Sequence, residues 1–466
     1  AMANPRDLHA IRDVEFLLRA TVTPVIASAH RVQDLIQRYY SMEHVATQML
    51  AHVDNQRKPV SSNAGLELDS ASVMAHLNAG GPKPYVDLLN FLMISAVERK
   101  ASDIHLEPQL EDFRVRFRVD GMLREVLILP SFAIKPLTNR IKVVGKLDLS
   151  AYNKPQDGKV AANLEGRKLD MRIAVIPSQY GETVVIRLLD PAMLQTDLGE
   201  LGWQPRLLSS FYRMASQPQG IVLCVGPTGS GKSTTLYATI HRLQSETTSI
   251  ITVEDPIEYT IPGITQVQVN DRVGMTFSTV VRSLLRQDPN VIVIGEIRDT
   301  ETADAAFEAA NTGHLVLSTL HTNHAVSTIT RLIDLRVPPY MLGSSLNGVV
   351  AQRLVRTICP ACRTTFYPPA EILDTLRYTG DRRKQFARGE GCRACYDTGF
   401  KGRLGVYEVL WASRAMRQAI VENPDLEAVR AQHLAQGGTL LLNEGIRLAE
   451  EGLTSLDEVM RVAFSD

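Results

Sequence analysis

The chain contains 466 residues, 44% of them hydrophobic and 22% charged, and a length of this order predicts about three globular domains. Fifty Lys and Arg residues against 51 Asp and Glu residues give a net charge of −1, so no global positive field would hold nucleic acid or an anionic membrane non-specifically. The longest apolar runs, such as 220–225 and 291–294, are much shorter than the roughly 20 residues of a membrane-spanning helix. We therefore expect a soluble or at most peripheral protein.

Residues 1–77 predict a small α/β fragment followed by a linker. Segments 7–19 and 30–40 have the amphipathic period of helices, and 22–26 is extended around a proline. The chain opens on Ala-Met-Ala with no signal sequence after it, which indicates a trimmed N-terminus and a reducing compartment. Glycine and proline cluster at 78–84, so we expect a new unit to begin there.

Residues 84–190 predict a mixed antiparallel domain. Segment 85–99 has a broad apolar helical face, and 113–119 alternates Phe or Val with Arg, which is the period of a half-buried strand. Further strands are predicted at 169–175 and 184–189. The arginines of 113–119 would all face away from the core, where they require water or an anion.

From residue 200 onward, short apolar runs alternate with Gly-bearing turns and helical stretches, which is the pattern of a parallel α/β sheet. Residues 413–466 have compact helical patterns. The fold class is therefore α/β. Strands are predicted at 221–225, 250–253, 291–294 and 315–318.

A phosphate-binding loop lies between the first of these strands and a helical run. Its sequence fits the pattern G-x-x-x-x-G-K-[ST]. Glycines let backbone N–H groups close around phosphates at a helix N-terminus, Lys232 reaches the β- and γ-phosphates, and Ser233 holds Mg²⁺. We predict that ATP is the ligand. The predicted ATP-binding residues are Gly226, Pro227, Thr228, Gly229, Ser230, Gly231, Lys232, Ser233 and Thr234.

Two acidic residues, Glu254 and Glu296, each follow a predicted strand at the same edge of the sheet. A carboxylate at this edge of a P-loop sheet meets the Mg²⁺ or its water, and another group must orient the attacking water. Either acid could instead belong to a solvated rim. His314 and His321 bracket a further strand, and a lone histidine is more often structural.

Four of the five cysteines form two CxxC pairs, Cys359 with Cys362 and Cys392 with Cys395. Two such pairs can offer four thiolates to one tetrahedral Zn²⁺, which leaves no open position and makes the metal structural. The 29 residues between the pairs exceed those of a usual zinc ribbon, and two disulfides or a redox pair are the alternatives. The fifth, Cys224, lies in a strand-like run and is predicted to be a core residue.

Together these motifs resemble one family, the type II secretion and type IV pilus assembly ATPases of the GspE/PilB group. The resemblance covers nearly the whole chain. In this family the four-cysteine zinc module marks secretion and pilus assembly motors, whereas retraction ATPases usually lack it. Besides the P-loop and the CxxC pairs, the resemblance depends on segments 101–107 (ASDIHLE), 116–121 (RFRVDG), 155–158 (PQDG), 254–258 (EDPIE), 285–289 (LRQDP), 295–299 (GEIRD) and 313–323 (GHLVLSTLHTN).

The resemblance implies catalytic roles that spacing alone does not show. Glu254 would polarise the attacking water, Glu296 would be an atypical Walker B acid, and His321 would sense the γ-phosphate. Family arginines approach the nucleotide at a subunit boundary, where a cation supplied in trans would stabilise the transition state. For Arg116 and Arg118, a solvated strand face is an equally good explanation. The candidate arginines are Arg116, Arg118, Arg282, Arg286, Arg298 and Arg331.

Two positions depart from the family pattern. His324 stands where the family usually has Asp after Thr322 and Asn323, and Asn290 stands where a loop usually reads Asp-Pro-Asp. Both lie beside motifs rather than in them. We expect them to affect fine positioning more than hydrolysis.

The resemblance also implies the domain organisation. Residues 84–190 would be a PAS-like domain and 200–466 a RecA-like ATPase domain. The latter would include the zinc module at about 357–400 and a helical part at about 413–466. Residues 1–77 would be a fragment of the family's N-terminal platform-docking domain together with a linker.

By resemblance, the chain would be a cytoplasmic homohexamer at the inner face of the bacterial inner membrane, without inserting into it. Its partners would be an inner-membrane platform protein and the cytoplasmic domain of an inner-membrane assembly protein. Hydrolysis of ATP to ADP and phosphate would power pseudopilus assembly and protein export, with type IV pilus extension as the alternative. A RecA-like nucleic-acid motor and a regulatory ATP-binding module are more distant hypotheses, disfavoured by the near-neutral charge and by the two acids.

Overall fold

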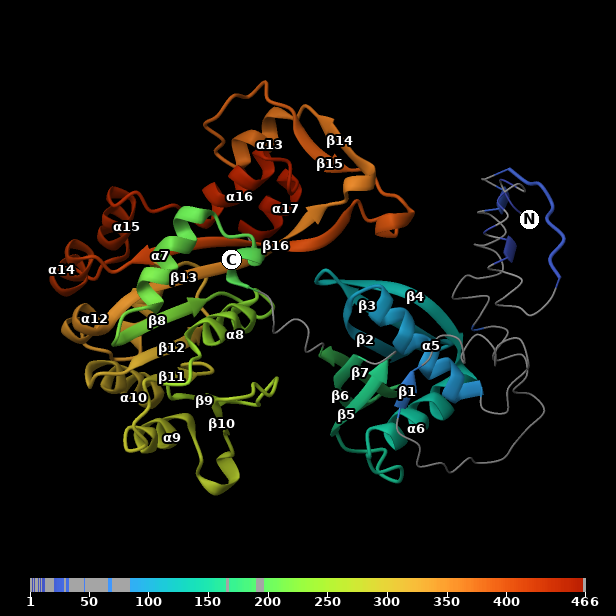
Figure 1. Ribbon diagram of the computed structural model, residues 1–466, viewed down its shortest axis with the longest axis horizontal. Coiled ribbons are helices and arrows are strands. Elements are labelled where there is room, and N and C mark those ends of the chain that lie inside the picture. The colour runs from blue at the N-terminus through green and yellow to red at the C-terminus, as the bar shows by residue number, and fades with distance from the viewer. Residues whose placement is uncertain are drawn as a thin grey trace. The chain divides into compact units, whose positions relative to one another are not determined.

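The computed structural model describes residues 84–164, 167–189 and 197–463, the strand β1 (Leu66–Leu68) and scattered positions from 2 to 46. The chain divides into two compact units, Ala1–Asp190 and Pro191–Asp466, and Figure 1 shows both. Among the helices of the described ranges, none has the length and apolarity needed to cross a bilayer.

Little of the predicted N-terminal fragment is described. The predicted helices at 7–19 and 30–40 lie mostly outside the described residues. The predicted extended piece at 22–26 carries one isolated bridge, in which Ile26 pairs with Met2, rather than a strand.

The first unit is built on a seven-stranded sheet with strand order β1-β5-β6-β7-β2-β3-β4. β1 pairs with β5 in parallel, and the remaining neighbours are antiparallel. The antiparallel strands predicted within 84–190 are therefore found, and the parallel strand β1 is additional. The strands after β1 are β2 (Ala101–Pro108), β3 (Asp112–Val119), β4 (Met122–Pro130), β5 (Gln156–Leu164), β6 (Arg167–Ser178) and β7 (Gly181–Leu189).

Helices α5 (Pro84–Glu98) and α6 (Ile134–Val144) contribute their apolar faces to the core of this sheet (Figure 1). In β3, Phe113, Val115 and Phe117 are buried in that core. The intervening arginines lie on the opposite face, because successive side chains of a strand point in opposite directions. The alternating sequence thus identified the core face of β3 correctly.

The second unit contains a seven-stranded sheet with strand order β10-β9-β11-β12-β8-β13-β16. Its neighbours are parallel except β13 and β16, which are antiparallel. The four predicted strands are found, and β10, β13 and β16 are additional. The strands are β8 (Gly220–Val225), β9 (Ile250–Glu254), β10 (Thr265–Gln268), β11 (Val291–Ile294), β12 (Leu315–Leu320), β13 (Leu346–Ile358) and β16 (Phe400–Trp411).

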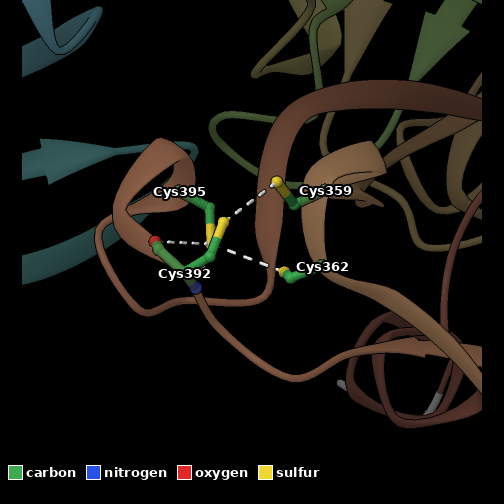
Figure 2. Close-up of side chains that lie close together, drawn as sticks. All are labelled: Cys359, Cys362, Cys392 and Cys395. Carbon is green, nitrogen blue, oxygen red and sulfur yellow. Dashed lines mark hydrogen bonds between the residues drawn. The ribbon is translucent and has the colours of Figure 1, made fainter. Parts of the chain in front are cut away.

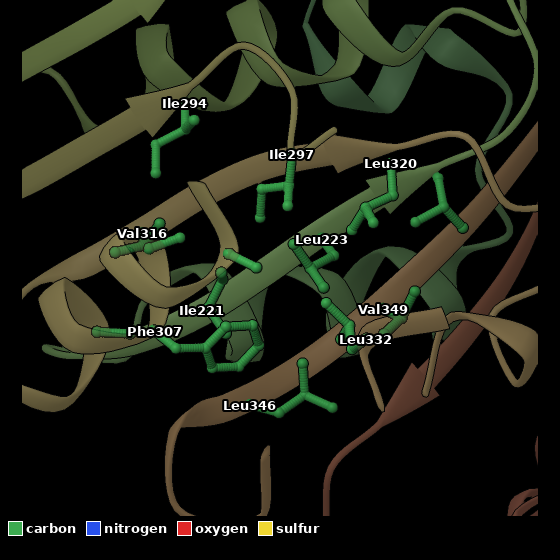
Figure 3. Packing of buried hydrophobic residues seen from close by; sticks show 14 of the residues in the cluster. Ile221, Leu223, Ile294, Ile297, Phe307, Val316, Leu320, Leu332, Leu346 and Val349 are labelled. Atoms are coloured by element: carbon green, nitrogen blue, oxygen red, sulfur yellow. The ribbon is translucent and has the colours of Figure 1, made fainter. Parts of the chain in front are cut away.

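Helices cover both faces of this sheet, and its central strands β8 and β11 are accordingly apolar along their whole length. In β8, Ile221 and Leu223 join one core and Val222 and Cys224 join the other. Figure 3 shows the first core, where Phe307 packs beside Ile221. Cys224 is fully buried, as predicted. Helices α9 (Phe277–Leu284), α10 (Thr300–Asn311), α11 (Ser327–Asp334) and α12 (Pro339–Ser345) border the first core, and α7 (Pro205–Ala215) and α8 (Lys232–Leu243) border the second.

The cysteine-bearing part of the second unit rests on the last two helices. A two-stranded sheet of β14 (Arg363–Phe366) and β15 (Phe386–Gly389) stands beside helix α13 (Ala370–Thr375). Leu373 and Phe386 of this part share an apolar cluster with Ala449 and Leu456. The four closing helices are α14 (Arg414–Glu422), α15 (Leu426–Ala435), α16 (Leu441–Glu450) and α17 (Leu456–Ala463), and short 3-10 turns lie at Ser131–Ala133, Leu198–Leu201, Asp271–Val273, Pro360–Cys362 and Arg393–Cys395.

Candidate functional site

The predicted phosphate-binding loop connects β8 to the N-terminus of α8, at the carboxyl edge of the sheet. Gly226, Gly229 and Gly231 have φ values of 149°, 79° and 91°, a region that L-residues with a side chain rarely adopt. A Cβ on Gly226 would lie 2.5 Å from the backbone oxygen of Gln352, and one on Gly231 would lie 2.6 Å from Gln352 Nε2. The loop therefore requires glycine for its shape as well as for its approach to β13.

The polar groups of this loop fit a triphosphate. Lys232 Nζ donates to the backbone oxygens of Gly226 (2.6 Å) and Pro227 (3.0 Å), and burial lowers the pKa of Lys232 to about 8. Ser230 Oγ is buried and makes no hydrogen bond within the described part of the chain. Ser233 is exposed at the first turn of α8. A helix N-terminus with a buried cation and an orphan hydroxyl suits a phosphate chain, and Ser233 is a hydroxyl of the same turn that could hold Mg²⁺.

Glu296 lies just beyond β11 and contacts an arginine and a histidine side chain. Its Oε2 lies 3.2 Å from His321 Nε2, and its Oε1 accepts a hydrogen bond from Arg298 Nη2. Arg298 Nη1 also lies 3.6 Å from Asp255 Oδ2. Burial alone would raise the pKa of Glu296, but the bonds from Arg298 and His321 hold that pKa below its ordinary value. The structure therefore brings three predicted site residues, Glu296, Arg298 and His321, into one ionic cluster.

Glu254, at the end of β9, is buried in a different environment. Its carboxylate accepts hydrogen bonds from Tyr237 Oη (2.5 Å), Thr252 Oγ1 (2.6 Å) and Gln266 Nε2 (3.0 Å). These three donors are neutral, whereas Glu296 accepts a hydrogen bond from the cationic Arg298. Since Glu254 is only 7% exposed, the alternative of a solvated rim is wrong for this residue.

The two histidines around β12 lie at opposite ends of the strand. His314 precedes the strand, where its Nδ1 hydrogen-bonds the backbone oxygen of Ala309 (3.0 Å). His321 follows the strand and contacts Glu296. Only His321 therefore lies at the edge of the sheet that carries the P-loop.

The other predicted arginines do not join the ionic cluster in this chain. Arg116 and Arg118 belong to the first unit, where they pair with Glu107 (2.6 Å) and Asp103 (3.4 Å). The carboxylates of the same domain thus supply the anions that the arginine-bearing strand face requires. Arg282 and Arg286 are exposed on and just after α9, and Arg331 is exposed on α11.

The two departures from the family pattern each have a local contact. Asn290 Oδ1 accepts the backbone N–H of Ser249 (2.7 Å), a bond that an aspartate would also accept. His324 Nδ1 lies 3.8 Å from Oε2 of Glu408, which is fully buried. A histidine therefore places a potential cation beside a buried carboxylate.

The four cysteines of the CxxC pairs converge from two turns, as Figure 2 shows. Their Sγ atoms all lie within 4.8 Å of one another, and three of the separations are 3.7, 3.8 and 3.9 Å. A tetrahedral Zn²⁺ with Zn–S bonds of about 2.3 Å would hold its sulfurs about 3.8 Å apart. All four thiols are free, so no disulfide joins the pairs. The cluster fits a structural zinc ion.

The ionisation of the thiols also suits a cation. Burial alone would raise the pKa of Cys395, but the backbone N–H groups of Cys392 and Gly399 lower it to about 6. Burial and the neighbouring thiols raise the pKa of Cys362 to about 12. Four thiolates at this spacing repel one another, and a divalent metal is what would let them ionise together.

Sequence reasoning missed the side chains that surround the predicted acids and the loop. Tyr237, Thr252 and Gln266 hold Glu254, and Gln352 of β13 lies against the P-loop. For Tyr237 a signal existed, since it lies four residues after Ser233 and hence on the same face of the helix. For Gln352 the sequence offered no signal. Gln352 reaches the P-loop because β13 pairs with β8, and such long-range pairing cannot be seen in a local pattern.

Comparison with known proteins places these features in a family. Residues 78–461 match the family described as type II/IV secretion system protein, and residues 1–46 match the MshEN domain. The type IV pilus assembly ATPase PilB of Myxococcus xanthus is 39% identical over 99% of this chain and 81% of its own length. The type II secretion system ATPase E of Vibrio cholerae is 40% identical over 94% of this chain and 88% of its own length. The crystal structure of the pilus retraction motor PilT with bound ADP superposes with a TM-score of 0.54 at 27% identity, covering 80% of this chain and 95% of that one.

Proposed function

The chain belongs to the type II/IV secretion system protein family and is an ATPase, and from this premise we propose that it powers protein export in a type II secretion system. The main support for this proposal is that the chain is similar, over most of its length, to several proteins named type II secretion system ATPase E or protein E. The type IV pilus assembly ATPase among its relatives makes pilus extension the alternative.

ATP would bind with its phosphates in the loop 226–231 at the N-terminus of α8. Lys232, which here closes the loop on the oxygens of Gly226 and Pro227, would bind the β- and γ-phosphates, with Thr234 and the loop backbone around them. Mg²⁺, held through Ser233, would neutralise charge on the phosphate oxygens. The exposed position of Ser233 and the orphan Ser230 hydroxyl support this placement.

Hydrolysis requires a group that orients the attacking water and groups that bind the γ-phosphate. We assign the water to Glu254, whose carboxylate is held by three neutral donors. Glu296 would act as the Walker B acid beside the metal. His321, bonded to Glu296, would report the presence of the γ-phosphate to that acid.

Assembly would complete the site. In a homohexamer, Arg116 and Arg118 of one subunit, or Arg282, Arg286, Arg298 and Arg331 of the ATPase domain, would approach the nucleotide at a subunit boundary. Arg116 would then exchange its bond to Glu107 for a phosphate oxygen. Such an arginine stabilises the charge of the transition state, so hydrolysis would depend on ring formation.

The proposed motor would consist of three parts. Residues 84–190 would be a PAS-like domain, 200–466 a RecA-like domain, and 1–77 a docking fragment with its linker. The motor would work at the cytoplasmic face of the inner membrane, against a platform protein and the cytoplasmic domain of an assembly protein. The four-cysteine cluster within about 357–400 would hold structural Zn²⁺.

A chromosomal Lys232→Ala substitution in the source bacterium tests the proposal. We expect the exported enzymes to disappear from the culture medium and to accumulate in intact cells. Surface pili are counted in the same strain. Unchanged export with loss of pili would contradict the secretion assignment and establish the pilus alternative.

A further inference from the structure

Glu254 is held by side chains from three successive elements of the second unit. Tyr237 comes from α8, Thr252 from β9 itself and Gln266 from β10. All three donate to the carboxylate at 2.5 to 3.0 Å. Three hydrogen bonds fix the orientation of this carboxylate, and none of their donors carries a charge, unlike Arg298 beside Glu296.

Tyr237 connects this carboxylate to the phosphate-binding helix. It lies four residues after Ser233 on α8, and residues four apart share one face of a helix. Ser233 is exposed at the start of the helix, and Tyr237 is buried one turn further on. Burial, together with the negative charge of Glu254, raises the pKa of Tyr237. Its hydroxyl therefore keeps the proton that it donates.

Gln266 closes the same environment from the edge of the sheet. Its Nε2 donates both to Glu254 (3.0 Å) and to the backbone oxygen of Tyr259 (2.9 Å), and its Oε1 accepts the N–H of Ile261 (2.8 Å). The Tyr259 ring meets the Tyr237 ring edge-on at 5.9 Å. The tyrosine hydroxyl thus has a fixed direction, and it points at the Glu254 carboxylate.

We propose that Tyr237 is a positioning residue, which sets the Glu254 carboxylate at a fixed place relative to the P-loop helix and hence to the bound phosphates. The inference rests on the proposed role of Glu254 toward the attacking water. The in-line geometry of attack is sensitive to the position of the water. Loss of the bond from Tyr237 to Glu254 therefore lowers the turnover rate more than it lowers the affinity for ATP.

The test uses the full chain and steady-state ATP hydrolysis, with kcat and KM measured separately. Tyr237→Phe removes one oxygen and leaves the ring. Tyr407→Phe is the matched control, because Tyr407 is a buried tyrosine of the same unit whose hydroxyl donates one bond, to the backbone oxygen of Leu201 (3.0 Å). Glu254→Gln and Lys232→Ala serve as references, and thermal unfolding is recorded for every variant.

We expect Tyr237→Phe to lower kcat about tenfold with KM for ATP within about twofold of the wild type. Tyr407→Phe should lower the unfolding temperature comparably and leave kcat within about twofold. Equal kcat in the two Phe variants would overturn the inference, as would a Tyr237→Phe effect confined to KM.

The references separate this inference from the proposed function. Normal turnover of Glu254→Gln together with an inactive Lys232→Ala would remove the role of Glu254, and the inference with it, while the ATPase assignment would stand. Normal turnover of Lys232→Ala would refute the ATP site itself. The inference is supported if Tyr237→Phe lowers kcat while Glu254→Gln and Lys232→Ala are both inactive.

Discussion

His321 Nε2 lies 3.2 Å from Glu296 Oε2, although 25 positions separate the two residues in the chain. They meet because β11 and β12 are parallel neighbours, and the carboxyl ends of parallel strands lie at one edge of the sheet. The strand partnership thus joins two motifs that the sequence presents as separate.

Glu296→Gln removes the negative charge from this cluster and preserves its shape. We expect turnover to fall by at least about 100-fold, because the carboxylate that we propose as the Walker B acid is lost, while ATP still binds. Steady-state hydrolysis and equilibrium binding of a fluorescent ATP analogue provide the two readouts. Weak binding with normal turnover of the bound ATP would contradict the Walker B assignment.

His321→Ala should lower turnover about tenfold, since Glu296 loses its contact with the residue that we propose to sense the γ-phosphate. His314→Ala is the matched control, because His314 lies at the other end of the same strand and bonds the backbone oxygen of Ala309. We expect the control to hydrolyse ATP within about twofold of the wild-type rate. Equal losses in both variants would indicate a structural effect on β12.

Arg116→Gln tests whether an arginine acts across a subunit boundary. In concentrated, assembled protein we expect turnover at least about tenfold below the wild type, and in dilute protein no difference. Arg114→Gln is the control, as Arg114 lies on the same strand face and pairs with Glu125 at 3.0 Å. Light scattering follows assembly at each protein concentration. The assignment is wrong if the loss of turnover in Arg116→Gln does not depend on protein concentration.

Cys392→Ser should abolish zinc binding, because three remaining thiolates do not close a structural site. The wild type is expected to carry about one zinc per chain by elemental analysis, and Cys224→Ala about the same, since Cys224 lies in the core away from the cluster. Wild-type zinc content in Cys392→Ser would be incompatible with the four-thiolate site. We also expect the variant to lose heat stability, since the cysteine-bearing part packs on α16 and α17.

Glu458 predicts a pH dependence of stability. Burial alone would raise the pKa of this carboxyl, but Arg461 and Arg356 lower it from an ordinary value of 4.5 to about 2. Its stabilisation is therefore complete above about pH 4.5 and is lost as the pH falls toward 2. Glu458→Gln should lower the free energy of unfolding by about 3 kcal/mol at pH 7, and the difference should shrink below pH 4.5.

Denaturant titrations at several pH values measure this difference. Glu451→Gln is the control, because Glu451 pairs with Arg447 on the surface, with 49% of its side chain exposed. A surface pair contributes less than about 1 kcal/mol. A difference between Glu458→Gln and the wild type that is constant from pH 7 to pH 3 would exclude the ionised pair as its source.

The sequence predicted the strands that lead to the site better than it predicted their neighbours. Runs such as 221–225 and 291–294 are apolar throughout, because both faces of their sheet are covered, and they became β8 and β11 with almost the same bounds. The strands β13 and β16 were not predicted. In β13, Asn347, Gln352 and Arg353 are polar yet buried, which breaks the apolar pattern of a buried strand.

The same limit applies to the site. P-loop glycines and CxxC pairs are local patterns, so their positions could be read directly from the sequence. The bond from Tyr237 to Glu254 could not, since it depends on how α8 packs over β9. The exposed Arg298 gave no local signal of its contact with Glu296 either, and only the family resemblance brought it into the site.

β13 has one more structural consequence. Gln352 and Arg353 of this strand lie against the P-loop, and the strand runs on to Ile358, which directly precedes Cys359 of the four-cysteine cluster. Six residues of extended chain span about 20 Å, and this stretch pairs with β16, with one shift of register between Arg356 and Ile358. One continuous strand, rather than a loop, therefore connects the phosphate loop to the cysteine cluster.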